Sequence, residues 1–459
     1  MRKLLLAASL IGCTLAPHYH RPPLPVQDRF PGGGGSLVAA DQGWRKMFGD
    51  PRLQALIALA LANNRDLRVA ALNVELTRAQ FRIQRAQLVP TVGGLAVGSR
   101  AGGGAAGGGS AGALPIPARF YVLGVSASYE LDLFGRVRSL TVQALEQYLS
   151  TVEGHRAAHL ALVGQVVTQY LSERSYAEQY GVAVGTEVTT RQTYELTKQL
   201  FEDGQKSELD VRATEAQWQN ARAQVQTLWR QWVQAVDALV VLVGQPLPAN
   251  LPPPQPLTSQ QMIADLAPGI PSQVLLRRPD VVEAEHALRA ANANIGAARA
   301  MFFPNISLTG LAATLTSAFD KLFSSGTGLF LFSTMITQPL FTGGANIANL
   351  DAAHVQKDIR IAQYEKTIQT AFREVADALV ARETFERQLA AQIAQVQAQQ
   401  VRFDLSQERY REGVASYLDV LTAQNDLYSA QLALISLRAD RLTNLADLYR
   451  ALGGGWREY

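Results

Sequence analysis

The spacing of hydrophobic residues changes in a fixed order along the chain. Residues 51–88 carry apolar side chains three and four positions apart, as in an amphipathic helix, with a break at 63–65, and Pro90 ends the pattern. Residues 120–133 alternate apolar with small or polar side chains, as in a strand with one apolar face. Residues 136–201 contain no proline and are rich in helix formers, which predicts a helix of roughly 65 residues, or roughly 100 Å.

The second half of the chain repeats this order. A period of about half the chain indicates a tandem duplication rather than a short-period repeat array. The second copy predicts strands at 305–314 and 327–340 and a long helix at 343–410. The chain is therefore predicted to be an α+β protein with four strands, two from each copy. Six residues recur 214 positions later without a gap, among them Asp66, Arg85 and Pro90 as Asp280, Arg299 and Pro304.

Each long helix is followed by the same short turn sequence. A glycine interrupts the helical pattern and a Ser-x-x-Asp sequence restarts it, as an N-cap does. The return helices predicted at 209–243 and 418–452 both end in a glycine, Gly244 and Gly453. Each copy is therefore predicted to form a long antiparallel helical hairpin with the turn at its tip. The matching tip residues, 209 positions apart, are Gly204, Ser207, Leu209 and Asp210 in the first copy and Gly413, Ser416, Leu418 and Asp419 in the second.

These patterns divide the chain into six parts. The predicted parts are a signal peptide at 1–12, an extended N-terminal segment at 13–50, a first repeat at 51–244 with a β-hairpin at 91–134, a linker at 245–271 with eight prolines, a second repeat at 272–453 with a β-hairpin at 305–341, and a C-terminal tail at 454–459.

The single cysteine, Cys13, follows a short basic and apolar start. This start is too short to span a bilayer and is typical of a targeting peptide. Residues 10–13, Leu-Ile-Gly-Cys, match the signal at which bacterial lipoproteins are cleaved and lipidated. We therefore expect Cys13 to carry a lipid anchor; the alternative is an ordinary signal peptide with a chance cysteine.

Composition and motifs argue against most other classes of function. The net charge of +3 provides no basic excess for nucleic acid, and 47% hydrophobic with 18% charged residues excludes a disordered chain. The glycine-rich stretch 101–113 lacks the spacing of a phosphate-binding loop and is predicted to be a surface loop. His155 and His159 lie one helical turn apart but have no third metal ligand nearby. No catalytic triad is recognisable, so we expect neither an enzyme nor a cofactor.

The predicted strands require assembly. Their alternation is typical of a barrel strand with lipid outside and water inside. Four strands cannot close a barrel, and open sheet edges are not tolerated in lipid. Two copies would supply eight strands, whose lumen is filled by side chains, whereas three would supply twelve and leave a water-filled bore. We therefore expect a trimer or a larger assembly.

Four stretches resemble the TolC family of outer-membrane efflux proteins, in its lipidated drug-efflux branch, and the resemblance covers nearly the whole chain. The resemblance implies a homotrimer with a twelve-stranded outer-membrane β-barrel, four strands per chain, continued by a helical coiled-coil barrel in the periplasm. It also implies a passive exit duct for small amphipathic toxic compounds, in contact with outer-membrane lipid. Its implied partners are an inner-membrane RND-type pump and a periplasmic adaptor that docks on the tips near Gly204 and Gly413. The four stretches are 13–22, 277–281, 302–304 and 413–424.

The resemblance also implies a periplasmic gate at the tips. The family closes this end with two acidic rings, of which Asp419 matches the first, whereas the second position is Thr422. Leu418 offers an apolar constriction instead, and Tyr410 matches a position that ties closed tips together. Two structural alternatives stay open, namely that Asp419 only caps its helix and that Tyr410 only packs between helices.

Two rival functions remain open. One is an exit duct for one-step (type I) protein secretion, and the other is a lipid-anchored coiled-coil scaffold without a pore. A scaffold would give no conductance in a planar bilayer, which separates it from both channel functions.

Overall fold

The computed structural model describes residues 14–27, 30, 37–38, 43–100, 119–263, 266–267 and 275–454. The predicted signal peptide at 1–12, Cys13 and the loop at 101–113 lie outside the described residues. The chain forms two compact units, and each draws on both halves of the sequence. Unit 1 comprises Met1–Pro22, Val74–Thr151 and Ala284–Tyr364, and unit 2 comprises Pro23–Asn73, Val152–Glu283 and Glu365–Tyr459.

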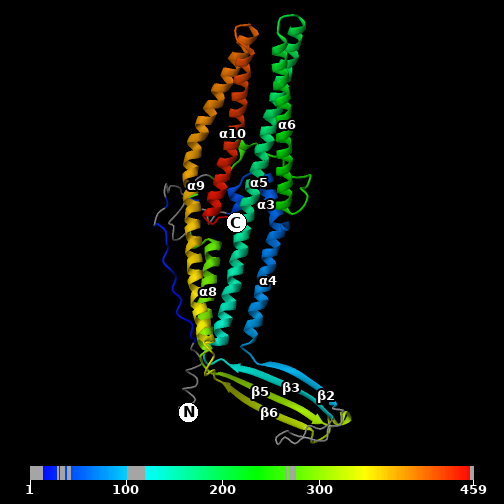
Figure 1. The fold of residues 1–459 in the computed structure, drawn as a ribbon, viewed down its shortest axis with the longest axis vertical. Coiled ribbons are helices and arrows are strands. Elements are labelled where there is room, and N and C mark those ends of the chain that lie inside the picture. Colours follow the sequence, from blue (N-terminus) through cyan, green and yellow to red (C-terminus); the bar gives the residue numbers. More distant parts are fainter. Residues whose placement is uncertain are drawn as a thin grey trace. The chain divides into compact units, whose positions relative to one another are not determined.

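Long helices make up most of the described chain (Figure 1). The four helices of the two predicted hairpins begin and end within two residues of their predicted bounds, because proline-free stretches and glycine turns are local signals. No helix in the described part of the chain combines the length and the mean hydropathy needed to cross a membrane. The helices are α2 (Trp44–Met47), α3 (Pro51–Asn63), α4 (Arg65–Ala86), α5 (Arg136–Glu202), α6 (Glu208–Val243), α8 (Pro279–Ala300), α9 (Ala345–Arg411) and α10 (Tyr417–Ala451).

Unit 1 contains a four-stranded antiparallel sheet in the order β2-β3-β5-β6. Among the described residues, β2 and β6 each pair with one neighbour only, so the sheet has two open edges. The prediction that the last strand reaches Leu340 is wrong: β6 ends at Thr337, shortly before Pro339, which has no N–H to donate to a ladder. The strands are β2 (Thr91–Arg100), β3 (Arg119–Leu131), β5 (Asn305–Thr316) and β6 (Gly328–Thr337).

The described N-terminal residues of unit 1 run along α8. Asn292 donates a hydrogen bond to the carbonyl oxygen of Pro17 at 2.7 Å. A Cβ atom on Gly296 would lie 2.7 Å from the backbone nitrogen of Ala16, so only glycine lets the segment approach α8 this closely. The extended segment therefore packs against α8 through specific contacts, although it has no hydrophobic core of its own.

A cluster of charges fixes the same segment further along α8. Arg21 and Arg289 contact the two oxygens of the buried Glu285 at 2.8 Å and 2.6 Å. Burial opposes ionisation of Glu285, but hydrogen bonds and charges from Arg21 and Arg289 outweigh it and hold the pKa of this carboxyl below its ordinary value. The ionised carboxylate therefore joins residues that lie far apart in the sequence.

Unit 2 contains a buried polar hub at Asp50. Its carboxylate caps α3 by accepting the N–H of Arg52 at 2.8 Å, and it also accepts the hydroxyl of Tyr170 at 2.6 Å and the amide of Gln260 at 2.8 Å. Asp50 is fully buried. One carboxylate therefore ties α3, α5 and the proline-rich linker together, and its burial is offset by several hydrogen bonds.

The duplication also repeats a tertiary contact in unit 2. Asn64, just before α4, donates to the carbonyl oxygen of Leu242 near the end of α6, at 2.9 Å. Arg278, just before α8, donates to the carbonyl oxygen of Ala451 at the end of α10, also at 2.9 Å. The donors are 214 positions apart and the acceptors 209, which are the two repeat distances of the sequence. Each side chain satisfies a carbonyl that the end of a helix leaves without an intrahelical partner.

A second β-sheet in unit 2 has two short parallel strands, β1 (Leu37–Val38) and β4 (Leu266–Ala267). It pairs the N-terminal segment with the linker.

Candidate functional site

The tip of the first hairpin is a tight turn with a capped restart. Gly204 has a φ of +75°, which a glycine adopts without strain, and Gln205 closes the turn by donating to the carbonyl oxygen of Leu200 at 2.8 Å. The Ser207 hydroxyl accepts the N–H of Asp210 at 3.2 Å, and the Asp210 carboxylate accepts the N–H of Ser207 at 3.1 Å. This reciprocal pair is a capping box, which begins α6.

The tip of the second hairpin has the same geometry. Gly413 has a φ of +76°, and Val414 donates to the carbonyl oxygen of Arg409 at 2.9 Å. Ser416 and Asp419 form the equivalent capping box at the start of α10, with 3.1 Å between the Ser416 nitrogen and Asp419 Oδ2. The helix caps predicted from the two Ser-x-x-Asp sequences are therefore present.

The candidate gate residues of α10 share one exposed face. Leu418, Asp419 and Thr422 are exposed, whereas Tyr417 before them and Val420 between them are buried. Leu418 is 67% exposed, and its counterpart in the first tip, Leu209, is 78% exposed. The helix thus brings an apolar, an acidic and a hydroxyl side chain to the same surface.

The capping box leaves the charge of Asp419 at the surface. Its Oδ2 atom accepts both the N–H and the hydroxyl of Ser416, at 3.1 Å and 2.9 Å. The Thr422 hydroxyl donates to the carbonyl oxygen of Leu418 at 2.8 Å, within its own helix. Asp419 can therefore cap α10 and still contribute a negative charge to whatever the exposed face contacts.

Tyr410 lies between the two tips. Its ring is 5.7 Å from the ring of Tyr417, and the ammonium of Lys206 from the first tip lies 4.4 Å from its centre. The buried Tyr410 hydroxyl has no hydrogen-bond partner among the described residues. Burial, with a smaller contribution from Tyr410, raises the pKa of Tyr417 to about 12. The structure therefore links the tips by packing and a cation–π contact. The resemblance implied a tie at Tyr410, but nothing in the sequence indicated Lys206 as its partner.

Residues further along the hairpins join them by polar contacts. Gln217 of α6 donates to the Asn425 side chain of α10 at 2.9 Å. Within the second hairpin, Arg402 of α9 is 2.6 Å from Asp426 of α10. The first contact joins the two hairpins behind their tips, and the second joins the two helices of the second hairpin.

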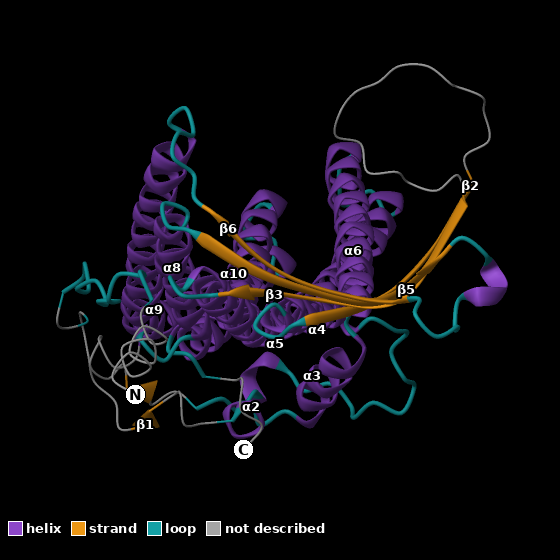
Figure 2. Ribbon diagram, turned by 90° about the horizontal axis from the view of Figure 1, so that it is seen from below, coloured by secondary structure: helices purple, strands orange, loops and turns teal. Residues whose placement is uncertain are grey.

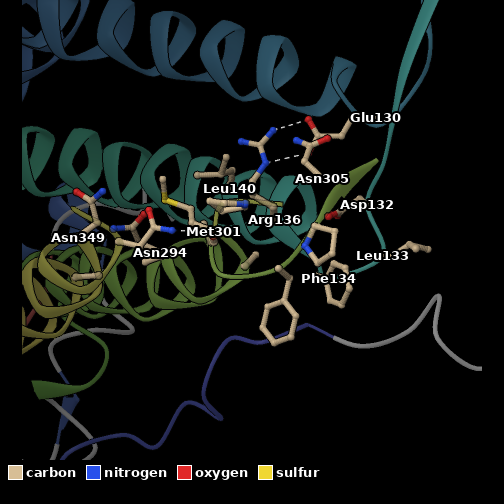
Figure 3. Close-up of a pocket in the computed structure, with 18 of the residues that line it drawn as sticks. Glu130, Asp132, Leu133, Phe134, Arg136, Leu140, Asn294, Met301, Asn305 and Asn349 are labelled. Carbon is tan, nitrogen blue, oxygen red and sulfur yellow. Dashed lines mark hydrogen bonds and ion pairs between the residues drawn. The ribbon is translucent and has the colours of Figure 1, made fainter. Parts of the chain in front are cut away.

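Sequence reasoning missed a cavity of about 930 Å³ in unit 1, where the strands meet the helices (Figure 3). Phe134 and Phe303 stack at its wall with ring centres 4.6 Å apart, and Arg136 is paired with Glu130 at 2.6 Å. Asn294 and other amide side chains also line it. The one signal in the sequence was the recurrence of Pro90 as Pro304, which lines the cavity.

The described residues contain no group of three or more His, Cys, Asp or Glu side chains that could hold a metal ion. His155 and His159 both lie on α5 and belong to no such group.

Comparisons with known proteins agree with this architecture. The family model described as outer membrane efflux protein matches residues 56–245 and 270–454. The chain is 48% identical over 454 residues to the toluene efflux pump outer membrane protein TtgC of Pseudomonas putida, which covers 97% of this chain and 93% of the relative. The antibiotic efflux pump outer membrane protein ArpC of Pseudomonas putida matches with the same identity and coverage.

A solved structure extends the match to the fold. The open state of the MtrE outer membrane channel of Neisseria gonorrhoeae superposes with a TM-score of 0.88 at 42% identity, covering 97% of this chain and 99% of that chain. The helix-rich chain with one four-stranded antiparallel sheet is thus the fold of an outer-membrane channel, and the resemblance noted in the sequence is confirmed. Because the family model matches most of the chain and the relatives align over nearly all of it, the chain belongs to the outer membrane efflux protein family.

Proposed function

We propose that this chain is the outer-membrane exit duct of a tripartite efflux system for small amphipathic toxic compounds. The duct is passive, and an inner-membrane RND-type pump drives transport through a periplasmic adaptor. Relatives named for toluene and for antibiotic efflux are each 48% identical to the chain, which supports a broad class of small solutes. Equal identity to both relatives favours neither solute over the other.

The open sheet is the observation that carries this proposal. β2 and β6 form its two edges, and each pairs with one neighbour among the described residues. Unpaired backbone groups are costly in lipid, so the edges must find partners in other copies of the chain. Three copies supply twelve strands, enough for a water-filled barrel, whereas the lumen of eight is filled by side chains. A homotrimer is therefore the proposed functional unit.

The proposed chain organisation is two copies of one unit, at 51–244 and 272–453, joined by a linker at 245–271. The matching contacts of Asn64 and Arg278 support it, as does the match of the family model to two separate segments. Cys13 is the proposed lipid anchor after removal of a signal peptide at 1–12. The hydroxyl oxygens of Thr14 and Ser139 lie 3.1 Å apart, which supports a role for the residues after Cys13 in holding the anchored end of the chain against unit 1.

The two tips form the proposed periplasmic gate and the docking surface for the adaptor. Three copies of Asp419 around an axis would form a ring of negative charge. Three copies of the exposed Leu418 would form a ring of apolar side chains beside it. Thr422 adds no charge at the next step, so this gate has one acidic ring. Gly204 and Gly413 set the turns on which the adaptor docks. Lys206 against the Tyr410 ring supports a closed state in which the two tips are joined.

The proposal predicts both a cellular and an electrical phenotype. Deleting the gene from a cell that expresses the system should raise intracellular accumulation of an amphipathic dye. The purified protein should conduct ions in a planar bilayer. A protein without conductance would be a scaffold, and normal accumulation after deletion would remove the efflux function.

A further inference from the structure

The four-stranded sheet is bent, and its two faces can be told apart (Figure 2). A Cβ atom on Gly124 would lie 2.4 Å from the Cβ of Ala313, its partner across β3 and β5. Cβ atoms of directly opposed residues are normally about 4.5–5.5 Å apart. On the other face, nothing lies within 4 Å of a Cβ on Gly94 or Gly310. Crowding of Cβ atoms marks the concave side, which we call the inner face.

A complete row of hydroxyl side chains crosses the inner face. Thr91 pairs with Ser128, Ser128 with Thr309, and Thr309 with Ser333, so each of the four strands contributes one hydroxyl. The side-chain oxygens of Thr91 and Ser128 are 2.7 Å apart. Side chains on one face recur every second residue, which places these four on the same side as Gly124 and Ala313. We call these four residues the hydroxyl row.

The next rows toward the far ends of the strands become apolar. Ser126, on β3, is the last hydroxyl before this change and pairs with Leu311. Gly124 and Ala313 lie between the leucines of the edge strands and leave space there because their side chains are small. The larger side chains of this zone, which we call the apolar rows, are Leu95, Val97, Phe120, Val122, Leu311, Leu315, Leu329 and Leu331.

The inner face carries almost no charge. Among the inner-face positions of the four strands, Glu130 is the one ionisable residue. Its carboxylate is neutralised by Arg136, which donates to its two oxygens at 2.9 Å and 2.6 Å. A charged solute would therefore find no unpaired opposite charge here and would lose hydration without compensation.

We propose that the inner face is a two-zone contact surface for uncharged amphipathic solutes, an inference that rests on the proposed duct function. The apolar part of the solute lies on the apolar rows while its hydrogen-bonding group contacts the hydroxyl row. Leu311 and Leu315 are the specificity-determining residues of the apolar zone, because they lie on β5, an inner strand of each chain's sheet. Uncharged amphipathic solutes are therefore retained longer than either ions or sugars.

Current blockades in a planar bilayer test this surface directly. The purified full chain is exposed to hexyl glucoside, which has a hydroxyl-rich head and an apolar tail, and to glucose, which lacks the tail. We expect hexyl glucoside to block the current for longer than glucose. Replacing both leucines, Leu311→Thr with Leu315→Thr, should shorten the hexyl glucoside blockades about tenfold, because the apolar contact on β5 is lost in every copy of the chain. Threonine is β-branched and suits a strand.

The matched control changes two residues on the opposite face of β3, Leu123→Thr with Val125→Thr, and should leave blockade times unchanged. If the variant with Leu311→Thr and Leu315→Thr conducts and its hexyl glucoside blockades are as long as those of the unmodified protein, the inference is overturned and the duct function stands. If this variant does not conduct, Thr309→Val, a nearly isosteric change in the hydroxyl row, is tested in its place. It should shorten the hexyl glucoside blockades severalfold, and unchanged durations would overturn the inference. Absent conductance in the unmodified protein would instead remove the duct function itself.

Discussion

The two hairpin tips have the same residues and turn geometry but differ in what surrounds them. The glycines have φ values of +75° and +76°, and both return helices begin with a Ser–Asp capping box. The return helices nevertheless pack differently. The buried residues of α6 include Thr214, Ala221, Leu228 and Ala235, each seven positions apart, which is a single seam facing a partner helix.

The return helix of the second hairpin is buried far more completely. Sixteen residues of α10 are buried, against seven of α6, although the helices differ in length by one residue. In its second half, residues on several sides of α10 are buried, including Leu442, Leu445 and Leu448. The duplicated sequence has thus kept the turn, which needs only local residues, while the packing around it has diverged. A helix held by one seam opens more readily than one buried on several sides, so the first hairpin should be the more mobile.

The largest expected effect concerns the residues that cap the return helices. Arg278 contacts Asp280 and Glu374 as well as the end of α10, and its side chain is 6% exposed. Arg278→Ala leaves two carboxylates and a carbonyl without their donor and should destabilise the protein by about 3 kcal/mol. Asn64→Ala removes a neutral hydrogen bond to α6 and the cap of α4, where Asn64 accepts the N–H of Leu67 at 2.9 Å, and should cost about 1–2 kcal/mol.

Denaturant unfolding of both variants in detergent, followed by circular dichroism, measures this difference. Equal losses would mean that Glu374 and Asp280 find water instead, and that the two ends are energetically equivalent.

The glycines that end the return helices give the second difference. Gly244 and Gly453 have φ values of +78° and +77°, so either substitution by alanine costs about 1 kcal/mol in backbone strain. A Cβ on Gly244 would also lie 2.5 Å from the carbonyl oxygen of Asn63, whereas at Gly453 the nearest atom is 3.5 Å away. Gly244→Ala should therefore destabilise the protein by about 2 kcal/mol more than Gly453→Ala. Similar unfolding midpoints for the two variants would show that the backbone at Asn63 shifts to make room for the added methyl group.

These contacts also mark the limit of what the sequence predicts. Proline-free stretches, the glycine turns and the Ser-x-x-Asp caps are local, so the hairpins and their tips followed from the sequence within two residues. The alternation in β3 and the repeat of the pattern in the second half of the chain predicted four strands. The contacts of Lys206 with Tyr410 and of Arg278 with Glu374 depend on how the helices are placed against one another, which spacing within one helix does not determine. The cavity beside Phe134 was missed for the same reason.

The contact between the tips gives a smaller expected effect. Lys206→Gln removes the cation that lies 4.4 Å from the Tyr410 ring, and such contacts at exposed sites contribute about 0.5–1 kcal/mol. Local opening of the second tip should become about two- to fivefold more frequent, which amide hydrogen exchange in residues 410–420 reports. Lys198→Gln, an exposed lysine of α5, is the control and should leave this exchange unchanged. Equal exchange in both variants would mean that Tyr410 is held by Tyr417 alone.

The smallest expected effect on stability comes from neutralising the two matching aspartates, Asp210 and Asp419. Comparing the two variants separates the role of the charge from the role of the helix cap. Asp419→Asn and Asp210→Asn both keep an oxygen that can accept the serine N–H, so each should cost only about 0.5 kcal/mol through the lost helix-dipole interaction. The proposed gate assigns charge selection to Asp419, on the exposed face with Leu418 and Thr422. Asp419→Asn should therefore lower cation-over-anion selectivity and weaken block by divalent ions in planar bilayers, while Asp210→Asn leaves both unchanged. Equal selectivity in the two variants would leave Asp419 with the capping role alone, because the same loss of charge in the same local geometry would then have no effect at either tip.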